Sequence, residues 1–175
     1  DKMQRLPLLK PEPLPVQAMV NNDILILLDL NYTLVSNSHL KKQLRGTYAS
    51  KIAVEEYRRW LVDLVQGHTV CLCTVRHVGY EAQTVARIEA VTGWKPDHTF
   101  FNPLPDEWRG DVVKAPYLHN SIFPMFGMPS ERKYLALESA WATRAMYKRN
   151  GIVAVPVPKD GDYWQRLPFP PEWGI

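Results

Sequence analysis

Two apolar runs without polar alternation constrain the fold of this chain most strongly. Their sequences are ILILL at residues 24–28 and TVCLC at residues 69–73. A strand that is covered on one face alternates apolar and polar residues, whereas a strand covered on both faces has no need to alternate. Strands of the second kind occur in parallel sheets that carry helices on both sides. The two runs therefore predict an α/β fold with a central parallel sheet.

Helical patterns alternate with further apolar runs along the chain, as such a sheet requires. The predicted strands are 23–29, 69–74, 97–101, 133–137 and 152–156. The predicted helices are 50–66, 79–92, 116–125 and 139–150, with Pro116 opening the third. Gly67 and Gly151 follow the first and last helices, where a left-handed cap is favoured. We expect three layers, with helices on both faces of the sheet.

Proline-rich segments flank this α/β region. Residues 1–22 form a proline-rich arm, residues 23–157 form the predicted domain, and residues 158–175 form a tail rich in proline and aromatic residues. The chain has 175 residues, of which 46% are hydrophobic, and this suffices for one buried core. The arms either pack on their own domain or contact a protein partner, and the sequence leaves both alternatives open.

Composition and charge limit the classes of function. The formal net charge of +3 permits contact with phosphate groups without requiring a nucleic-acid partner. No apolar stretch is long enough for a membrane span and no signal-peptide pattern opens the chain, so we expect a cytoplasmic protein without membrane contact. Cys71 and Cys73 lie two residues apart on one predicted strand, so we expect free thiols. The histidines lack the spacing of zinc ligands.

Polar side chains stand where the predicted strands end. Asp29, Asn31 and Thr33 follow the first strand, Thr74 and Arg76 the second, and Glu138 and Ser139 the fourth, while Lys114 precedes the third helix. In open parallel sheets, ligands bind beyond the carboxyl ends of the strands. These residues are therefore the candidates for a functional site.

An aspartate, a hydroxyl group, a lysine and a second carboxylate at one sheet edge suit phosphate chemistry. Asp29 could attack phosphorus or hold Mg²⁺, and Glu138 could be the second metal carboxylate. Thr74 could donate a hydrogen bond to a phosphoryl oxygen, while Lys114 could offset its charge. Each residue alone also has an ordinary interpretation, as a turn residue, a helix cap or a surface lysine.

The order of these residues resembles that of the haloacid dehalogenase (HAD) superfamily. The four motifs of that superfamily correspond here to DLNYT (29–33), CTVRH (73–77), DVVK (111–114) and LALES (135–139). More narrowly, GDVVK and IFPMFG (122–127) are similar to the 3'-phosphatase domain of bacteriophage polynucleotide kinase. The resemblance covers about residues 23–157 and leaves both arms outside it.

The resemblance implies a Rossmann-like HAD fold and an Mg²⁺-dependent phosphatase that forms an aspartyl phosphate. It implies that Asp29 is the nucleophile, that Thr74 and Lys114 bind the phosphoryl group, and that Glu138 holds the metal together with Asp29. It also implies substrate contacts for Thr33 and Arg76. The implied substrate is the terminal phosphate of a nucleotide or nucleic acid. Neither connection between the first three motifs is long enough for a sizeable cap domain.

Three departures from the superfamily pattern weaken the implied activity. Asn31 stands where the second aspartate acts as general acid and base, although its carbonyl can still coordinate Mg²⁺. Loss of such a group costs about 10²- to 10⁴-fold in rate. Glu138 and Ser139 replace two aspartates, and Tyr32 replaces a glycine. The sequence thus predicts a weakened phosphatase or, alternatively, an inactive pseudo-enzyme that serves as a binding or assembly module.

A basic segment follows the first motif at residues 38–48. It contains Lys41, Lys42 and Arg45 beside Tyr48. Cations next to an aromatic ring could contact the end of a nucleic acid, and we predict substrate contacts for these three cations. The alternative is an ordinary solvated loop.

Overall fold

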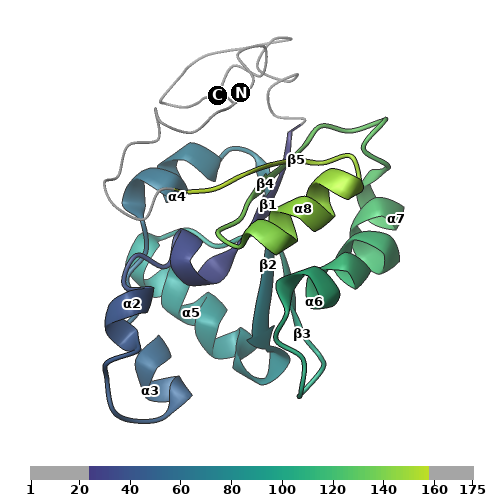
Figure 1. Ribbon diagram of the computed structural model, residues 1–175. Helices are drawn as coiled ribbons and strands as arrows, with labels where there is room; N and C mark the ends of the chain where they lie inside the picture. The colour runs from purple at the N-terminus through teal and green to yellow at the C-terminus, as the bar shows by residue number, and fades with distance from the viewer. Residues whose placement is uncertain (1–23, 158–175) are drawn as a thin grey trace.

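The parallel sheet lies at the centre of the computed structural model, which describes residues 24–157 (Figure 1). All of its strand pairs are parallel, and the strand order is β3-β2-β1-β4-β5. The strands are β1 (Leu25–Leu28), β2 (Thr69–His77), β3 (His98–Asn102), β4 (Tyr134–Leu137) and β5 (Val153–Val155). The predicted central parallel sheet is confirmed, and β1 stands between β2 and β4.

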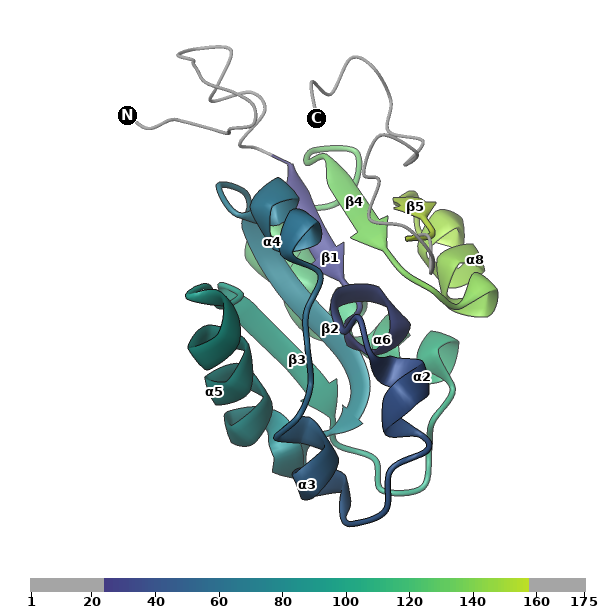
Figure 2. The same cartoon turned by 90° about the vertical axis from the view of Figure 1, so that its left-hand side faces the viewer.

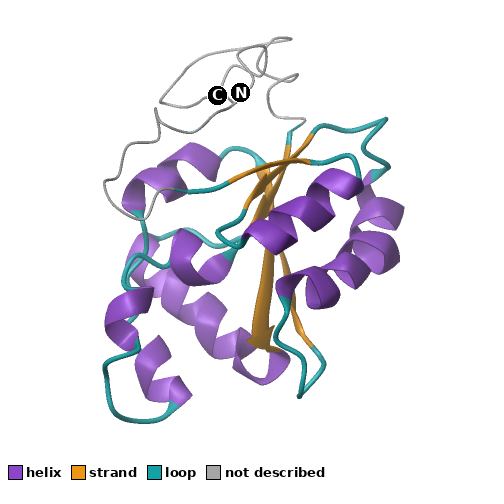
Figure 3. Cartoon of the chain, viewed as in Figure 1, coloured by secondary structure: helices purple, strands orange, loops and turns teal. Residues whose placement is uncertain are grey.

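Helices cover both faces of this sheet (Figures 1 and 3). After β1 come η1 (Leu30–Leu34), α2 (Ser38–Lys41), α3 (Tyr48–Ile52) and α4 (Arg59–Val65). After β2 come η2 (Val78–Tyr80) and α5 (Glu81–Thr92). The opposite face carries α6 (Gly110–Tyr117), η3 (Leu118–Ile122), α7 (Phe123–Phe126) and α8 (Trp141–Arg149). The three-layer α/β/α architecture is therefore confirmed.

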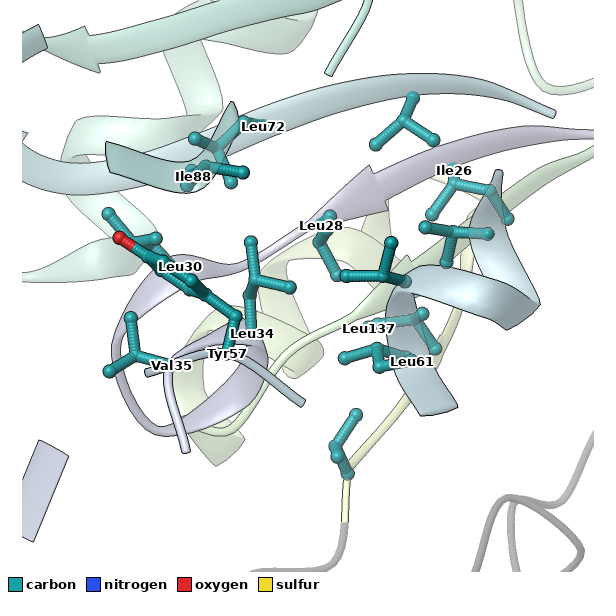
Figure 4. Close-up of a cluster of buried hydrophobic side chains, with 14 of the residues drawn as sticks. Ile26, Leu28, Leu30, Leu34, Val35, Tyr57, Leu61, Leu72, Ile88 and Leu137 are labelled. Carbon is teal, nitrogen blue, oxygen red and sulfur yellow. The ribbon is translucent and has the colours of Figure 1, made fainter. Parts of the chain in front are cut away.

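The two faces of the sheet bury separate apolar clusters. On β1, Ile26 and Leu28 point into the cluster that η1, α4 and α5 complete (Figure 4), while Leu25 and Leu27 point into the cluster under α6 and α8. All four strand residues of β1 are buried. Burial on both faces explains why the run ILILL contains no polar residue.

The predicted helix 50–66 is wrong, because residues 53–58 interrupt it. This stretch pairs its backbone with the end of η1 and the residues just after it: Arg58 N–H donates to the carbonyl of Leu34 at 2.9 Å, and Ser36 N–H donates to the carbonyl of Glu56 at 2.8 Å. Hydrogen bonds to a distant segment thus replace those that a continuous helix would have made within itself. The interruption carries Glu55 into the interior.

The predicted start of the helix at 116 is also wrong. The helix begins at Gly110, so Pro116 lies inside α6 and Lys114 is a helical residue rather than one that precedes the helix. Proline has no N–H to give to the preceding turn, and the helical backbone continues beyond it through the wider turn η3 into α7. The glycine caps are confirmed, since Gly67 and Gly151 have φ of 98° and 83°.

Candidate active site

The predicted site residues meet at one edge of the sheet. β1, β2 and β4 run in parallel; β1 and β4 end side by side, and β2 passes their ends and continues to His77 (Figure 2). Asp29 follows β1, Thr74 and Arg76 belong to β2, and Glu138 follows β4. Helix α6 brings Lys114 to the same place although it is 85 positions from Asp29.

Lys114 joins the two carboxylates of the site. Its Nζ donates to Asp29 Oδ1 at 2.9 Å and to Glu138 Oε1 at 2.6 Å. The second oxygen of Asp29 accepts hydrogen bonds from Thr33 Oγ1 at 2.9 Å and from Ser139 Oγ at 3.0 Å. All of these residues except Ser139 are buried. Thr33 was predicted to contact substrate; in the structure its hydroxyl group donates to the Asp29 carboxylate.

One cation shared by two carboxylates separates their pKa values. Burial is the largest influence on Asp29 and opposes its charged form, but the positive charge of Lys114 and the hydrogen bonds from Lys114 and Thr33 together lower the pKa of Asp29 below its usual range. Burial, followed by the negative charge of Asp29, raises the pKa of Glu138 to about 7. Burial alone would lower the pKa of Lys114, but the two carboxylates raise it. Asp29 is therefore the carboxylate that is ionised throughout the neutral range.

Arg76 fixes the position of Asn31. Its Nη2 donates to Asn31 Oδ1 at 3.0 Å, and its backbone N–H donates to Thr74 Oγ1 at 3.0 Å. Tyr48 accepts a third hydrogen bond from Arg76 Nε at 2.9 Å. Arg76 is only 2% exposed. It therefore acts as a buried support for the loop after β1, in addition to any role toward substrate.

Glu55 completes this support, and sequence reasoning missed it. Its side chain is fully buried, forms ion pairs with Arg76 and Lys41, and accepts a hydrogen bond from Tyr57 Oη at 3.0 Å. The neighbouring Glu56 is exposed, so two identical residues in succession have opposite environments. No local signal distinguishes them, because only the break in the predicted helix directs Glu55 inward.

The three predicted basic contacts have different environments. Lys41 is buried and paired with Glu55, so it does not extend into solvent. Lys42 and Arg45 are exposed, and Lys42 Nζ lies 5.3 Å from the centre of the Tyr32 ring. Tyr32 itself has φ of 62°, a left-handed conformation that costs a non-glycine residue about 1 to 2 kcal/mol. The loop therefore keeps a glycine-like backbone at this position.

The oxygen atoms at the site fit Mg²⁺ only in part. Ser139 Oγ lies 3.0 Å from Asp29 Oδ2 and 3.4 Å from the carbonyl oxygen of Asn31, so three hard oxygen atoms converge there. Only Asp29 contributes a carboxylate. Both oxygens of Glu138 have other partners, Lys114 Nζ and the Ala140 N–H at 3.1 Å. No group of three or more His, Cys, Asp or Glu residues suited to a metal is found within residues 24–157.

We expect Ser139→Asp to strengthen Mg²⁺ binding, because it adds a second carboxylate where three oxygens already converge. Without metal, the new charge beside Asp29 should lower the melting temperature, and Mg²⁺ should restore it. Calorimetric titration and thermal unfolding with and without Mg²⁺ measure both effects. Ser130→Asp, at an exposed position, is the matched control. Equal Mg²⁺ affinity in Ser139→Asp and wild type would contradict this placement of the metal.

Comparison with known proteins supports the fold. No family model matches the chain, and no curated protein sequence matches it significantly. A solved structure described as the Pnkp1/Rnl/Hen1 RNA repair complex matches with a TM-score of 0.58 at 17% sequence identity. The match covers 77% of this chain but only 42% of that one. Within residues 24–157, no helix is long and apolar enough to cross a membrane.

Proposed function

We propose that this domain is a HAD-type phosphatase that acts on the terminal phosphate of a nucleotide or nucleic acid. The contact between Lys114 Nζ and Asp29 Oδ1 carries the proposal. It joins residues of the first and third sequence motifs in one buried ion pair. The second oxygen of Asp29 accepts hydrogen bonds from Thr33 of the first motif and from Ser139 of the fourth. A structural ion pair alone would not need Thr74 and Arg76 at the same strand end.

The arrangement suits attack by Asp29 on phosphorus. Its lowered pKa keeps the carboxylate ionised, and Thr33 and Ser139 hold one of its oxygens in place. A carboxylate oxygen would form a bond to phosphorus while the bond to the leaving oxygen breaks, and Lys114 would offset the negative charge of the phosphoryl group. Mg²⁺, held by Asp29 and the Asn31 carbonyl, would neutralise phosphate charge when bound.

Asn31 makes this phosphatase slow. An amide has no proton to transfer to the leaving oxygen and cannot take one from the water that releases phosphate from Asp29. Both protons must then move through solvent. The RNA repair complex with the similar fold favours a nucleic-acid substrate over a small metabolite.

Phosphate release tests the proposal. Wild-type protein is incubated with Mg²⁺ and single-stranded RNA or DNA that carries a 3'-phosphate, and inorganic phosphate is measured. We expect release from wild type and none above background from Asp29→Asn, after circular dichroism has shown that the variant is folded. Asp63→Asn, whose side chain is 50% exposed on α4, is the matched control and should keep full activity. Equal phosphate release by wild type and Asp29→Asn would refute the proposed phosphatase activity.

A phosphate-dependent binding module is the second candidate. The contacts of Glu138 favour it, because both of its oxygens are engaged by Lys114 and Ala140 rather than directed at a metal. In this case wild type would bind 3'-phosphorylated RNA more tightly than RNA with a 3'-hydroxyl and release no phosphate. The predicted contacts of the two arms with a protein partner lie outside the described residues.

A further inference from the structure

Two tryptophans lie on the surface close to the proposed phosphate site. Trp108 is 62% exposed and Trp141 is 74% exposed. Trp60 and Trp94, the other tryptophans within residues 24–157, are half-buried and pack against the core. Tryptophan is usually a well-buried residue because its side chain carries a large apolar area. Two largely exposed indole rings therefore call for a partner.

The two tryptophans flank one contact between helices. Trp108 lies two residues before Gly110, the first residue of α6, and Trp141 is the first residue of α8. The helices approach closely there, because a Cβ atom added to Gly110 would lie only 2.3 Å from Thr143 Oγ1. Figure 1 shows the first turns of α6 and α8 beside each other. Both tryptophans therefore belong to the same corner of the domain.

This corner adjoins the phosphate site. Trp141 follows Ser139 by two residues, which limits the distance between their Cα atoms to about 7.6 Å. Ser139 contacts Asp29, and α6 carries Lys114. Arg144 adds a positive charge, since its Nη1 donates to the carbonyl oxygens of Glu138 and Ser139 at 2.9 and 2.8 Å. The nucleotides next to a terminal phosphate held at Asp29 would therefore lie within reach of this corner.

We propose that Trp108 and Trp141 form a stacking platform for the bases next to the terminal phosphate of single-stranded nucleic acid. The inference rests on the proposed function, from which it takes the phosphate end. Aromatic side chains stack on unpaired bases of any sequence, whereas a protein partner would require a wider apolar surface. Leu104 is the one other large apolar residue exposed within five positions of either tryptophan, and the charged residues Glu107, Arg109, Asp111 and Arg144 lie within three positions. Glu107 is paired with Arg109 at 3.2 Å, and Asp111 and Arg144 have opposite charges, so these residues offer no net charge to the phosphate backbone and stacking is the main contact.

Binding as a function of oligonucleotide length tests the platform. Fluorescence anisotropy gives the affinity for a labelled single-stranded RNA octamer with a 3'-phosphate, and competition gives the affinity for a nucleoside 3'-phosphate. We expect wild type to bind the octamer more tightly than the mononucleotide. Trp108→Ala and Trp141→Ala should each weaken octamer binding by about 5- to 150-fold. Tyrosine at either position should retain most of the affinity, because it still offers an aromatic face.

Val91→Ala is the control, since Val91 is an exposed apolar residue near the end of α5. Octamer affinity unchanged in both alanine variants would overturn the inference and assign the tryptophans to another partner, such as a protein. Equal affinity for single-stranded and fully paired RNA would also overturn it, because paired bases have no free face. The two proposals can fail separately. If octamer binding depends on the tryptophans but no phosphate is released, the proposed phosphatase activity is refuted and the proposed stacking platform is supported.

Discussion

Replacing Glu55 by glutamine is expected to lower the free energy of unfolding by about 3 to 5 kcal/mol. Glu55 is fully buried and is the shared anion of Arg76 and Lys41, which are 2% and 6% exposed. Glutamine keeps the shape and some hydrogen bonds but leaves two positive charges buried without their counter-charge. Urea denaturation followed by circular dichroism measures the change.

Glu56→Gln provides the matched control, because the same substitution one residue away affects an exposed side chain. We expect it to change stability by less than about 0.5 kcal/mol. A loss below about 1 kcal/mol in Glu55→Gln would show that the buried cations find other partners or water.

The contribution of Glu55 also depends on pH. Burial raises its pKa, but Arg76 first and Lys41 second lower it below the usual range by hydrogen bonding and charge. A group with a lowered pKa in the folded state stabilises above its unfolded pKa of about 4.3, and this stability is lost as the pH falls through the folded value. Wild type should therefore lose stability in acid more steeply than Glu55→Gln, which unfolding at a series of pH values measures.

Asn31→Asp is expected to raise phosphate release by about 10²- to 10⁴-fold, because it restores a group that can transfer protons. The position is prepared for a carboxylate: Arg76 Nη2 already donates to Asn31 Oδ1 at 3.0 Å, and the bond would become charge-assisted. Arg76 would favour the ionised form of the new aspartate. The largest gain is therefore expected in the second step, in which this carboxylate accepts a proton from the water that hydrolyses the aspartyl phosphate. Steady-state release from 3'-phosphorylated RNA with Mg²⁺ measures the effect.

Asn120→Asp, at an exposed position in η3, is the matched control and should leave the rate unchanged. If Asn31→Asp brings no gain, the absence of a second metal carboxylate limits the reaction instead. The double variant Asn31→Asp/Ser139→Asp then decides the matter, since it supplies both missing carboxylates. A double variant that still releases no phosphate would leave the binding module as the better interpretation.

Sequence reasoning predicted well which residues of the site lie at the ends of strands. The uninterrupted run from 24 to 28 indicated a strand covered on both faces, and all four residues of β1 are buried. Once parallel strands are expected, the residues after them must meet at one edge, and Asp29 and Glu138 do meet there, where both bind Lys114 of α6. Glycine caps could likewise be predicted, because φ above zero is a local preference of glycine.

The sequence by itself determined the sheet, its layers and the edge at which the site forms, because burial periodicity and backbone preference act over a few neighbouring residues. Only the tertiary structure decided that Glu55 is buried while Glu56 is exposed, that Lys41 pairs inward, and that Ser139 rather than Glu138 lies beside the oxygens of Asp29 and Asn31. These environments depend on charged residues that are far apart in the sequence. A buried carboxylate must pair with a buried cation, and the packing of the helices decides which cation lies close enough.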